Sequence, residues 1–190
     1  MKIQSLLAFA LAAVATQAQT WKLDPAHTSV EFAIKHLAVS TVKGGFDKLD
    51  GSVAGDPKTP ASLVPEVTIQ ATSVNTNSEK RDEHLRTADF FDVAKFPTIV
   101  FKGEKTEVRD GKLFLEGTLT LHGVSKKVEV PYEANGPVVD PYKNTRIGLE
   151  GSFTIKRSDY GITSFPGVVG DEVKVDISAE FILATAPAAK

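Results

Sequence analysis

Apolar and polar residues alternate along most of this chain, and that period of two restricts its fold more than any other feature. In residues 113–121, LFLEGTLTL, leucines fall on one face of an extended chain. Residues 30–35, 67–72 and 147–155 follow the same rule. Because successive side chains of a strand point to opposite faces, each segment has one face suited to a core. The pattern predicts an all-β fold built from antiparallel strands.

Turn signals separate the alternating segments. Asp110-Gly111 stands between two of them, as expected for a two-residue hairpin, and His122-Gly123 marks a second turn. About eight or nine strands with one apolar face each fit either a sandwich or a closed barrel. Hairpin connections with one helical excursion favour the closed antiparallel barrel, with about eight strands and one or two short helices between them. The interior of such a barrel is either filled by side chains or holds one ligand.

Residues 75–97 lack the alternation. Thr76, followed three residues later by Glu79, fits a capping box and predicts a helix over residues 77–88. The apolar face of this helix is thin, so we expect it to lie on the surface or over an opening.

The N-terminal residues have the pattern of an export signal. Lys2 is followed by an apolar run over 6–14 and then by small residues. The run is too short to span a bilayer comfortably, although an uncleaved N-terminal anchor is the alternative. We expect a cleaved signal peptide over residues 1–18, one barrel domain over 19–184, a flexible tail over 185–190 and a periplasmic location.

Composition excludes several classes of function. A net charge of -2 over 190 residues gives no basic excess for binding nucleic acid. The absence of cysteine excludes disulfides, a thiol nucleophile and thiolate metal ligands. The four histidines show neither His-x-His nor His-x-x-x-His spacing, so we predict no metal site.

Two glycines interrupt the apolar faces of their strands. Gly117 and Gly151 occupy inward positions near the middle of strands whose flanking inward residues are large. One explanation is a bend at a barrel corner, with facing side chains closing the gap. The other is a dry apolar channel, left open by the missing side chains and suited to an aliphatic ligand. The residues alone leave both explanations open.

Four stretches of the chain together resemble the YceI family. They are WKLDPAHTSVEFAIKH (21–36), VKGGFDKLDGSV (42–53), RDEHLRTADFFDVAKFPTIVF (81–101) and LEGTLTLHGVSKKV (115–128). The combination is specific, although no single motif is, and it covers essentially the whole expected mature chain. The resemblance implies an exported protein with an all-β fold, an elongated eight-stranded antiparallel (lipocalin-like) barrel with one or two short helices between strands. It also implies an apolar tunnel that holds a long isoprenoid chain, such as a prenyl diphosphate or a quinone tail. This favours the channel at the two glycines.

Inward positions on the predicted strands are then candidate contacts for the lipid tail. They are Phe32, Ile34, Ile69, Phe101, Leu115, Gly117, Leu119, Leu149, Gly151, Phe153 and Ile177.

A mouth that meets the lipid headgroup is expected at a second set of residues. They are His27, Arg81, His84, Phe90 and Phe91. Arginine and histidine suit a diphosphate through charge-assisted hydrogen bonds. Simpler explanations are a solvated helix face with an Asp82–Arg86 ion pair, aromatic core anchors, and a hydrogen-bonded strand-entry histidine. The loop TSFPGVVG, residues 163–170, fits a lid or an ordinary connection.

Three functions are compatible with these features. The first is carriage, storage or protection of an isoprenoid lipid without catalysis, and transient contact with a membrane is compatible with such a role. The second is a stress-linked interaction protein with a solid barrel core. The third is an enzyme acting on such a lipid, but the chain has no G-x-S-x-G, P-loop or H-E-x-x-H motif. We therefore predict no catalytic residue and no cofactor besides the bound lipid, and leave the oligomeric state open.

Overall fold

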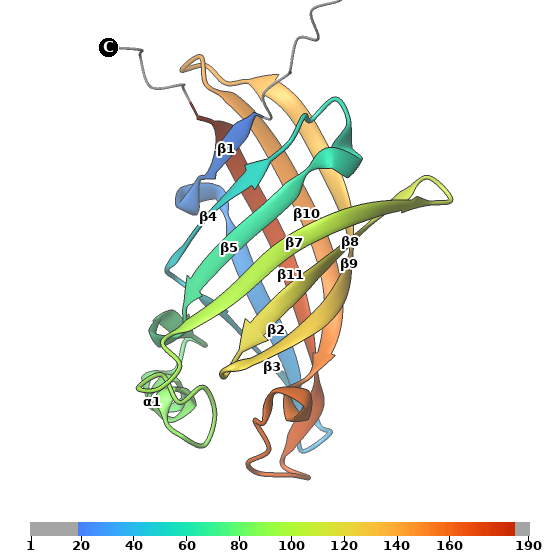
Figure 1. Ribbon diagram of the computed structural model, residues 1–190. Helices are drawn as coiled ribbons and strands as arrows, with labels where there is room; N and C mark the ends of the chain where they lie inside the picture. Colours follow the sequence, from blue (N-terminus) through green and yellow to red (C-terminus); the bar gives the residue numbers. More distant parts are fainter. Residues whose placement is uncertain (1–18, 185–190) are drawn as a thin grey trace, which may run out of the picture.

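Antiparallel strands account for most of residues 19–184, the part of the chain that the computed structural model describes (Figure 1). The strands are β1 (Thr20–Leu23), β2 (Ser29–His36), β3 (Ser40–Phe46), β4 (Leu49–Ala54), β5 (Val64–Gln70), β6 (Val74–Asn75), β7 (Thr98–Arg109), β8 (Lys112–Leu121), β9 (Val124–Val139), β10 (Thr145–Lys156) and β11 (Val169–Leu183). The helical segments are α1 (Glu79–Arg86) and four 3₁₀ turns, η1 (Pro25–His27), η2 (Pro60–Ser62), η3 (Ala71–Ser73) and η4 (Arg157–Tyr160). The predicted signal peptide and tail lie outside the described residues.

The sheet closes into the predicted eight-stranded barrel because three pairs of short strands each act as one interrupted strand. β1 and β2 follow one another along the same edge of β11, with Trp21 opposite Leu183 and Ile34 opposite Val173. β4 continues β3 in the same way and pairs with β1, while β3 pairs with β2. β5 and β6 form the third pair. Closure leaves no long unpaired edge in this ring.

Both predicted turns are confirmed. Asp110 and Gly111 join β7 to β8, and His122 and Gly123 join β8 to β9. All four residues have positive φ, between 51° and 75°. This is the backbone of a type I′ turn, which matches the twist of the strands that it connects.

The predicted helix exists, but its predicted start is wrong. α1 begins after Ser78, and Thr76 does not cap it. Instead, the Thr76 N–H and hydroxyl both donate to Oδ1 of Asp82, at 2.9 and 2.5 Å. Asp82 is therefore buried and binds Thr76, and the expected Asp82–Arg86 pair does not form. Among the described residues, no helix is long and apolar enough to cross a bilayer.

A packed apolar cluster closes the end of the barrel that carries β1. Trp21, Val53, Leu63 and Phe181 are each at most 1% exposed. The indole N–H of Trp21 donates to the carbonyl of Gly55 at 3.3 Å, so the polar edge of this side chain is satisfied. At the opposite end lie α1, the β2–β3 turn and the loop between β10 and β11 (Figure 1). The two ends of the barrel therefore differ.

Candidate functional site

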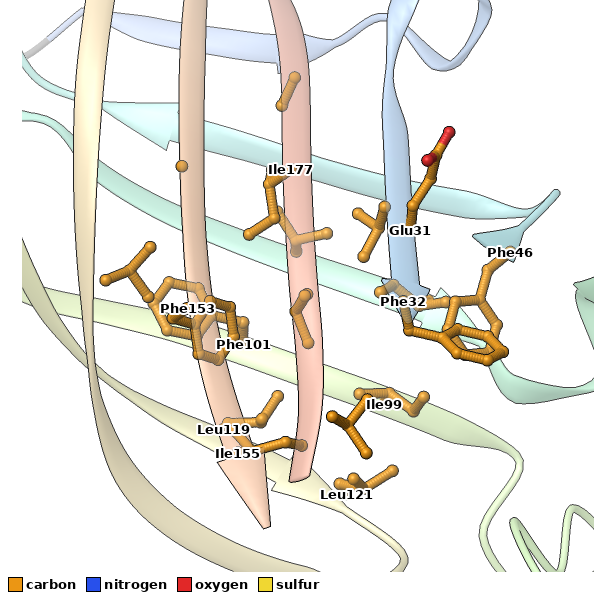
Figure 2. A pocket seen from close by; sticks show the side chains of 18 of the residues that line it. Glu31, Phe32, Phe46, Ile99, Phe101, Leu119, Leu121, Phe153, Ile155 and Ile177 are labelled. Atoms are coloured by element: carbon orange, nitrogen blue, oxygen red, sulfur yellow. The ribbon is translucent and has the colours of Figure 1, made fainter. Parts of the chain in front are cut away.

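The barrel contains a cavity of about 220 Å³ (Figure 2). Apolar side chains from strands all around the barrel form most of its wall. Those visible in Figure 2 include Phe32, Phe46, Ile99, Phe101, Leu119, Leu121, Phe153, Ile155 and Ile177. Wall residues near the β1 end are buried, whereas those near β2, β3 and the 87–97 segment are half-buried. The barrel is hollow, contrary to the solid-core alternative, and it opens toward the α1 end.

Every predicted tail contact except Gly117 lies on the wall of this cavity. Gly151 is one of them, and its neighbours on β9 are Val130 and Pro131. A Cβ at Gly151 would lie 3.1 Å from Cγ1 of Val130 and 3.1 Å from the carbonyl oxygen of Pro131, so β9 crowds this position and the glycine does not by itself open the channel. Whether these residues bind a lipid stays a prediction.

Gly117 corrects the sequence interpretation. It faces inward, but a Cβ atom there would lie 2.6 Å from Cζ of Phe101 and 2.6 Å from the carbonyl oxygen of Lys102. The space beside the glycine is therefore filled by the ring of Phe101, which reaches across from β7. The ring forms the cavity wall at this point and the glycine does not.

A second glycine holds an aromatic ring in the same way. Phe32 on β2 pairs directly with Gly44 on β3, and a Cβ at Gly44 would lie 2.6 Å from Cζ of Phe32. Phe32 packs on Phe46 with 5.9 Å between ring centroids, and Phe46 packs on Phe91 at 5.7 Å. Aromatic side chains laid over strand glycines thus shape two parts of the wall.

Tyr132 and Arg157, two polar residues at the cavity wall, already have protein partners. The Tyr132 hydroxyl donates to the carbonyl of Pro60 at 3.0 Å and lies 3.1 Å from Oγ1 of Thr106. Burial raises the pKa of Tyr132. Arg157 is buried and donates to the carbonyls of Ile162, Val169 and Gly170 at 2.8–3.0 Å. Among the described residues no buried side-chain polar atom lacks a partner. The cavity therefore offers apolar contact and few free hydrogen-bonding groups.

Phe90 and Phe91, which were predicted for the mouth, line the cavity at its α1 end. Phe90 stacks on Phe165 from the β10–β11 loop, with 5.8 Å between centroids and 13° between planes. His84 contacts both rings edge-on, at 5.1 and 5.4 Å, and its Nε2 lies 2.9 Å from Oδ2 of Asp89. His84 thus stands beside the mouth without lining the cavity.

Arg81 ties α1 to the sheet and does not reach the cavity. Its Nε donates to Oγ1 of Thr76 at 2.7 Å, and its Nη2 donates to the carbonyl of the same residue at 2.8 Å. Arg86 donates in parallel to the carbonyls of Thr72 and Val74. The guanidinium of Arg81 therefore binds Thr76 and does not reach the cavity, where the headgroup contact was predicted.

His27 lies in η1 beside β1, away from α1, so the predicted mouth residues do not form one group. Its Nδ1 lies 2.9 Å from Oδ2 of Asp24. Nη1 of Arg146 donates to Asp24 at 2.7 Å and to Glu180 at 2.5 Å, while Nε donates to Asp140 at 2.7 Å.

This network lowers the pKa of Asp24 and of Asp140. The hydrogen bond from Arg146 is the main cause that lowers the pKa of Asp24 to about 2 and that of Asp140 to about 2. Asp24, His27 and Glu180 lie close enough to share a cation. Nη1 of Arg146 already pairs with Asp24 and Glu180, so in this structure the cluster is an ion-pair network.

Several wall residues were missed by the sequence analysis. They include Val30, Phe46, Ile99, Ile155 and Phe181. Val30, Ile99 and Ile155 each lie two positions from a predicted residue and share its inward face. Strict extension of the alternation would have found them.

Comparisons with known proteins agree with this geometry. The family model for the YceI-like domain matches residues 21–181. A UPF0312 protein of Pseudomonas aeruginosa is 39% identical over 167 residues, covering 87% of this chain and 87% of that protein. A solved YceI protein from Campylobacter jejuni is 35% identical with a TM-score of 0.70, covering 80% of this chain and 90% of the other.

A more distant likeness concerns the fold alone. A polyisoprenoid binding domain from Saccharophagus degradans superposes with a TM-score of 0.70 at 18% identity. The match covers 87% of this chain and 99% of that one.

Proposed function

The chain belongs to the YceI family, and from that premise we propose that it binds the hydrocarbon tail of an isoprenoid lipid in the barrel cavity. The candidate ligands are a prenyl diphosphate and an isoprenoid quinone. Binding would serve carriage, storage or protection of the lipid, with no catalytic step and no cofactor. A relative of the same fold is a polyisoprenoid binding domain, which supports this class of ligand.

The observation that carries the proposal is the apolar wall, which continues from the buried β1 end to Phe90 and Phe91. Burial of hydrocarbon contributes roughly 0.8 kcal/mol per CH₂ group before entropy costs. A wall with few free polar groups favours a tail over a polar ligand of similar size, because the polar ligand would lose hydrogen bonds to water.

The size of the cavity adds a condition. Its volume of about 220 Å³ lies below the roughly 300–1,000 Å³ typical of sites for drug-sized ligands. We therefore expect the half-buried rings of Phe32, Phe101 and Phe153 to move when a long tail enters, or part of the tail to remain at the mouth.

Filling the cavity tests the proposal. Ile177 lines the cavity and lies opposite Gly151 in the β10–β11 ladder, so Ile177→Trp places an indole in the bore. We expect this variant to bind a long prenyl diphosphate at least tenfold more weakly than the wild type in isothermal titration calorimetry. Ser178→Trp is the matched control, because Ser178 is the exposed neighbour on the same strand. Equal affinity in all three proteins would overturn the proposed site.

We also propose that the protein acts in the periplasm after removal of residues 1–18. The pattern of these residues supports export. The intact mass of protein purified from its own host tests this, because cleavage before Gln19 gives a defined loss of mass and retention of Met1 would contradict it.

A further inference from the structure

Four large apolar side chains are exposed on two loops at the α1 end of the barrel. Leu37 and Val39 in the β2–β3 turn are 52% and 86% exposed, and Phe165 and Val168 in the β10–β11 loop are 43% and 39% exposed. We call these four residues the apolar tip. The N–H of Leu37 donates to the carbonyl of Val168 at 2.7 Å, so the two loops lie side by side. Single exposed apolar residues need no explanation, but such a group marks an interaction surface.

The stretches immediately around the apolar tip have no charged residue, although Arg157 and Asp159 stand at the start of the β10–β11 loop. Residues 37–42 and 160–170 contain no Asp, Glu, Lys or Arg. Backbone groups at the tip are also bonded within the protein, since the N–H groups of Val168 and Val169 both donate to the carbonyl of Phe165. Entry of these two stretches into lipid would therefore desolvate no charge of their own and few free backbone groups, which are the main costs of entry, although His84 and its partner Asp89 lie beside Phe165.

The apolar tip is continuous with the cavity. Phe165 stacks on Phe90, which lines the cavity wall, and Val169, next to Val168, lines it too. An apolar path thus leads from the exposed loops to the interior. A lipid bilayer, which supplies hydrocarbon chains, fits this apolar path better than a folded protein partner does. The reason is that the path ends in a cavity suited to a lipid tail.

The opposite end of the barrel lacks this arrangement, although it also exposes apolar side chains. Val138, Val139 and Tyr142 are 60%, 69% and 85% exposed. Their loop, however, contains Asp140 and Lys143, and the interior behind it is closed by the cluster around Trp21. Exposure alone therefore does not distinguish the two ends, whereas access to the cavity does.

We propose that the apolar tip docks on a lipid bilayer and holds the cavity mouth against it. A lipid tail then passes between bilayer and cavity without crossing water. The transfer step rests on the proposed function, whereas docking itself depends only on the tip.

Flotation with phosphatidylcholine vesicles tests docking. We expect the full-length mature protein to float with these neutral vesicles, and Val39→Asp and Phe165→Asn to reduce the vesicle-bound fraction at least fivefold each. Val39 is almost fully exposed, so its replacement does not disturb packing, and asparagine tolerates the positive φ of 57° at Phe165. Val139→Asp at the opposite end is the matched control and should float as the wild type does.

Three outcomes would overturn the proposal. They are a wild type that does not float, tip variants that float as the wild type does, and a control that loses binding equally. Cross-linking of the tip to a protein in the envelope, with no flotation of the wild type, would point to a protein partner instead.

A second measurement separates docking from cargo binding. Val39→Asp should bind prenyl diphosphate from detergent solution with unchanged affinity, but should take it from vesicles at least fivefold more slowly. Equal rates of extraction from vesicles would contradict docking and leave the proposed function standing. Failure of the wild type to bind the lipid from detergent, with flotation that still depends on the tip, would contradict the proposed function alone.

Discussion

A glycine in the middle of a strand has two different roles in this barrel. Gly151 forms part of the cavity wall at a position where β9 would crowd a Cβ, whereas at Gly117 and Gly44 the absent side chain makes room for a phenylalanine from the neighbouring strand. The rings of Phe101 and Phe32 then lie close to the sheet. At Gly117 and Gly44 the glycine affects the width of the cavity indirectly, because it allows a phenylalanine ring to lie close to the sheet.

Gly117→Ala should lower the free energy of unfolding by about 1–3 kcal/mol, the usual cost of overpacking. The new methyl group would lie 2.6 Å from the carbonyl oxygen of Lys102 as well as from Phe101. The ring can turn away, but the backbone oxygen cannot. Urea denaturation measures the effect. If Gly117→Ala had the same free energy of unfolding as the wild type, the ring of Phe101 and the backbone of β7 would be able to move aside without loss of stability, and the prediction would be wrong.

Gly148→Ala provides the control in the same barrel. A Cβ at Gly148 would meet only the Cβ of Asn135, at 3.6 Å, which is an ordinary contact. This variant should keep or slightly raise stability, because alanine loses less backbone entropy on folding than glycine.

The sequence could predict that these glycines face inward but not what faces them. Alternation places Gly117 on the inner face from residues 113–121 alone. The ring that covers it belongs to Phe101 on another strand, and its position depends on the register between β7 and β8. The sequence therefore identified the missing side chain at Gly117 correctly. The space beside it holds the ring of Phe101, however, and not part of the channel.

At the scale of elements, Arg146 joins three parts of the closed end. It links η1 through Asp24, the β9–β10 loop through Asp140, and β11 through Glu180. A lowered pKa in the folded state means that the carboxylate stabilises the fold above its ordinary pKa near 3.8. That contribution is lost as the pH falls from about 4 to about 2.

Arg146→Met should therefore lower the free energy of unfolding most at pH values above 4. The difference in the free energy of unfolding between wild type and variant should shrink as the pH is lowered toward 2. Protonated Asp24 and Asp140 are neutral and no longer form ion pairs with the guanidinium of Arg146. Urea unfolding at a series of pH values measures this difference. A difference that stays constant from pH 7 to pH 3 would show that Arg146 acts by packing and not by charge.

The mouth was the element that sequence reasoning placed least well. His27 stands at the start of one predicted strand, and His84 belongs to the helical segment, so both seemed suited to a barrel end. Because β1 and β2 form one interrupted strand, the break at His27 lies along β11 and away from α1. The position of His27 follows only from the pairing of β1 and β2 with β11, which lies far from them in the sequence. The hydrogen bonds of Thr76 with Asp82 and Arg81, which fix α1, are local in the sequence, but the capping-box interpretation gave Thr76 a different role.

At the scale of the whole molecule, the barrel has one closed and one open end. Trp21 and its neighbours fill the first, while Phe90 and the apolar tip surround the second. The alternation of residues predicted antiparallel strands and ten of the residues on the cavity wall, whereas the choice of a barrel over a sandwich also needed the hairpin connections and the family resemblance. Composition could not predict that the wall encloses a space, because the volume depends on how side chains from all strands meet.

Native mass spectrometry of the protein purified from its own host tests the central claim most directly. We predict a mature chain beginning at Gln19 with an isoprenoid lipid bound to the wild type and to Ser178→Trp, and no lipid bound to Ile177→Trp. A wild-type protein that carries no lipid, and that takes up neither added prenyl diphosphate nor added quinone, would contradict the claim that the cavity is a lipid site.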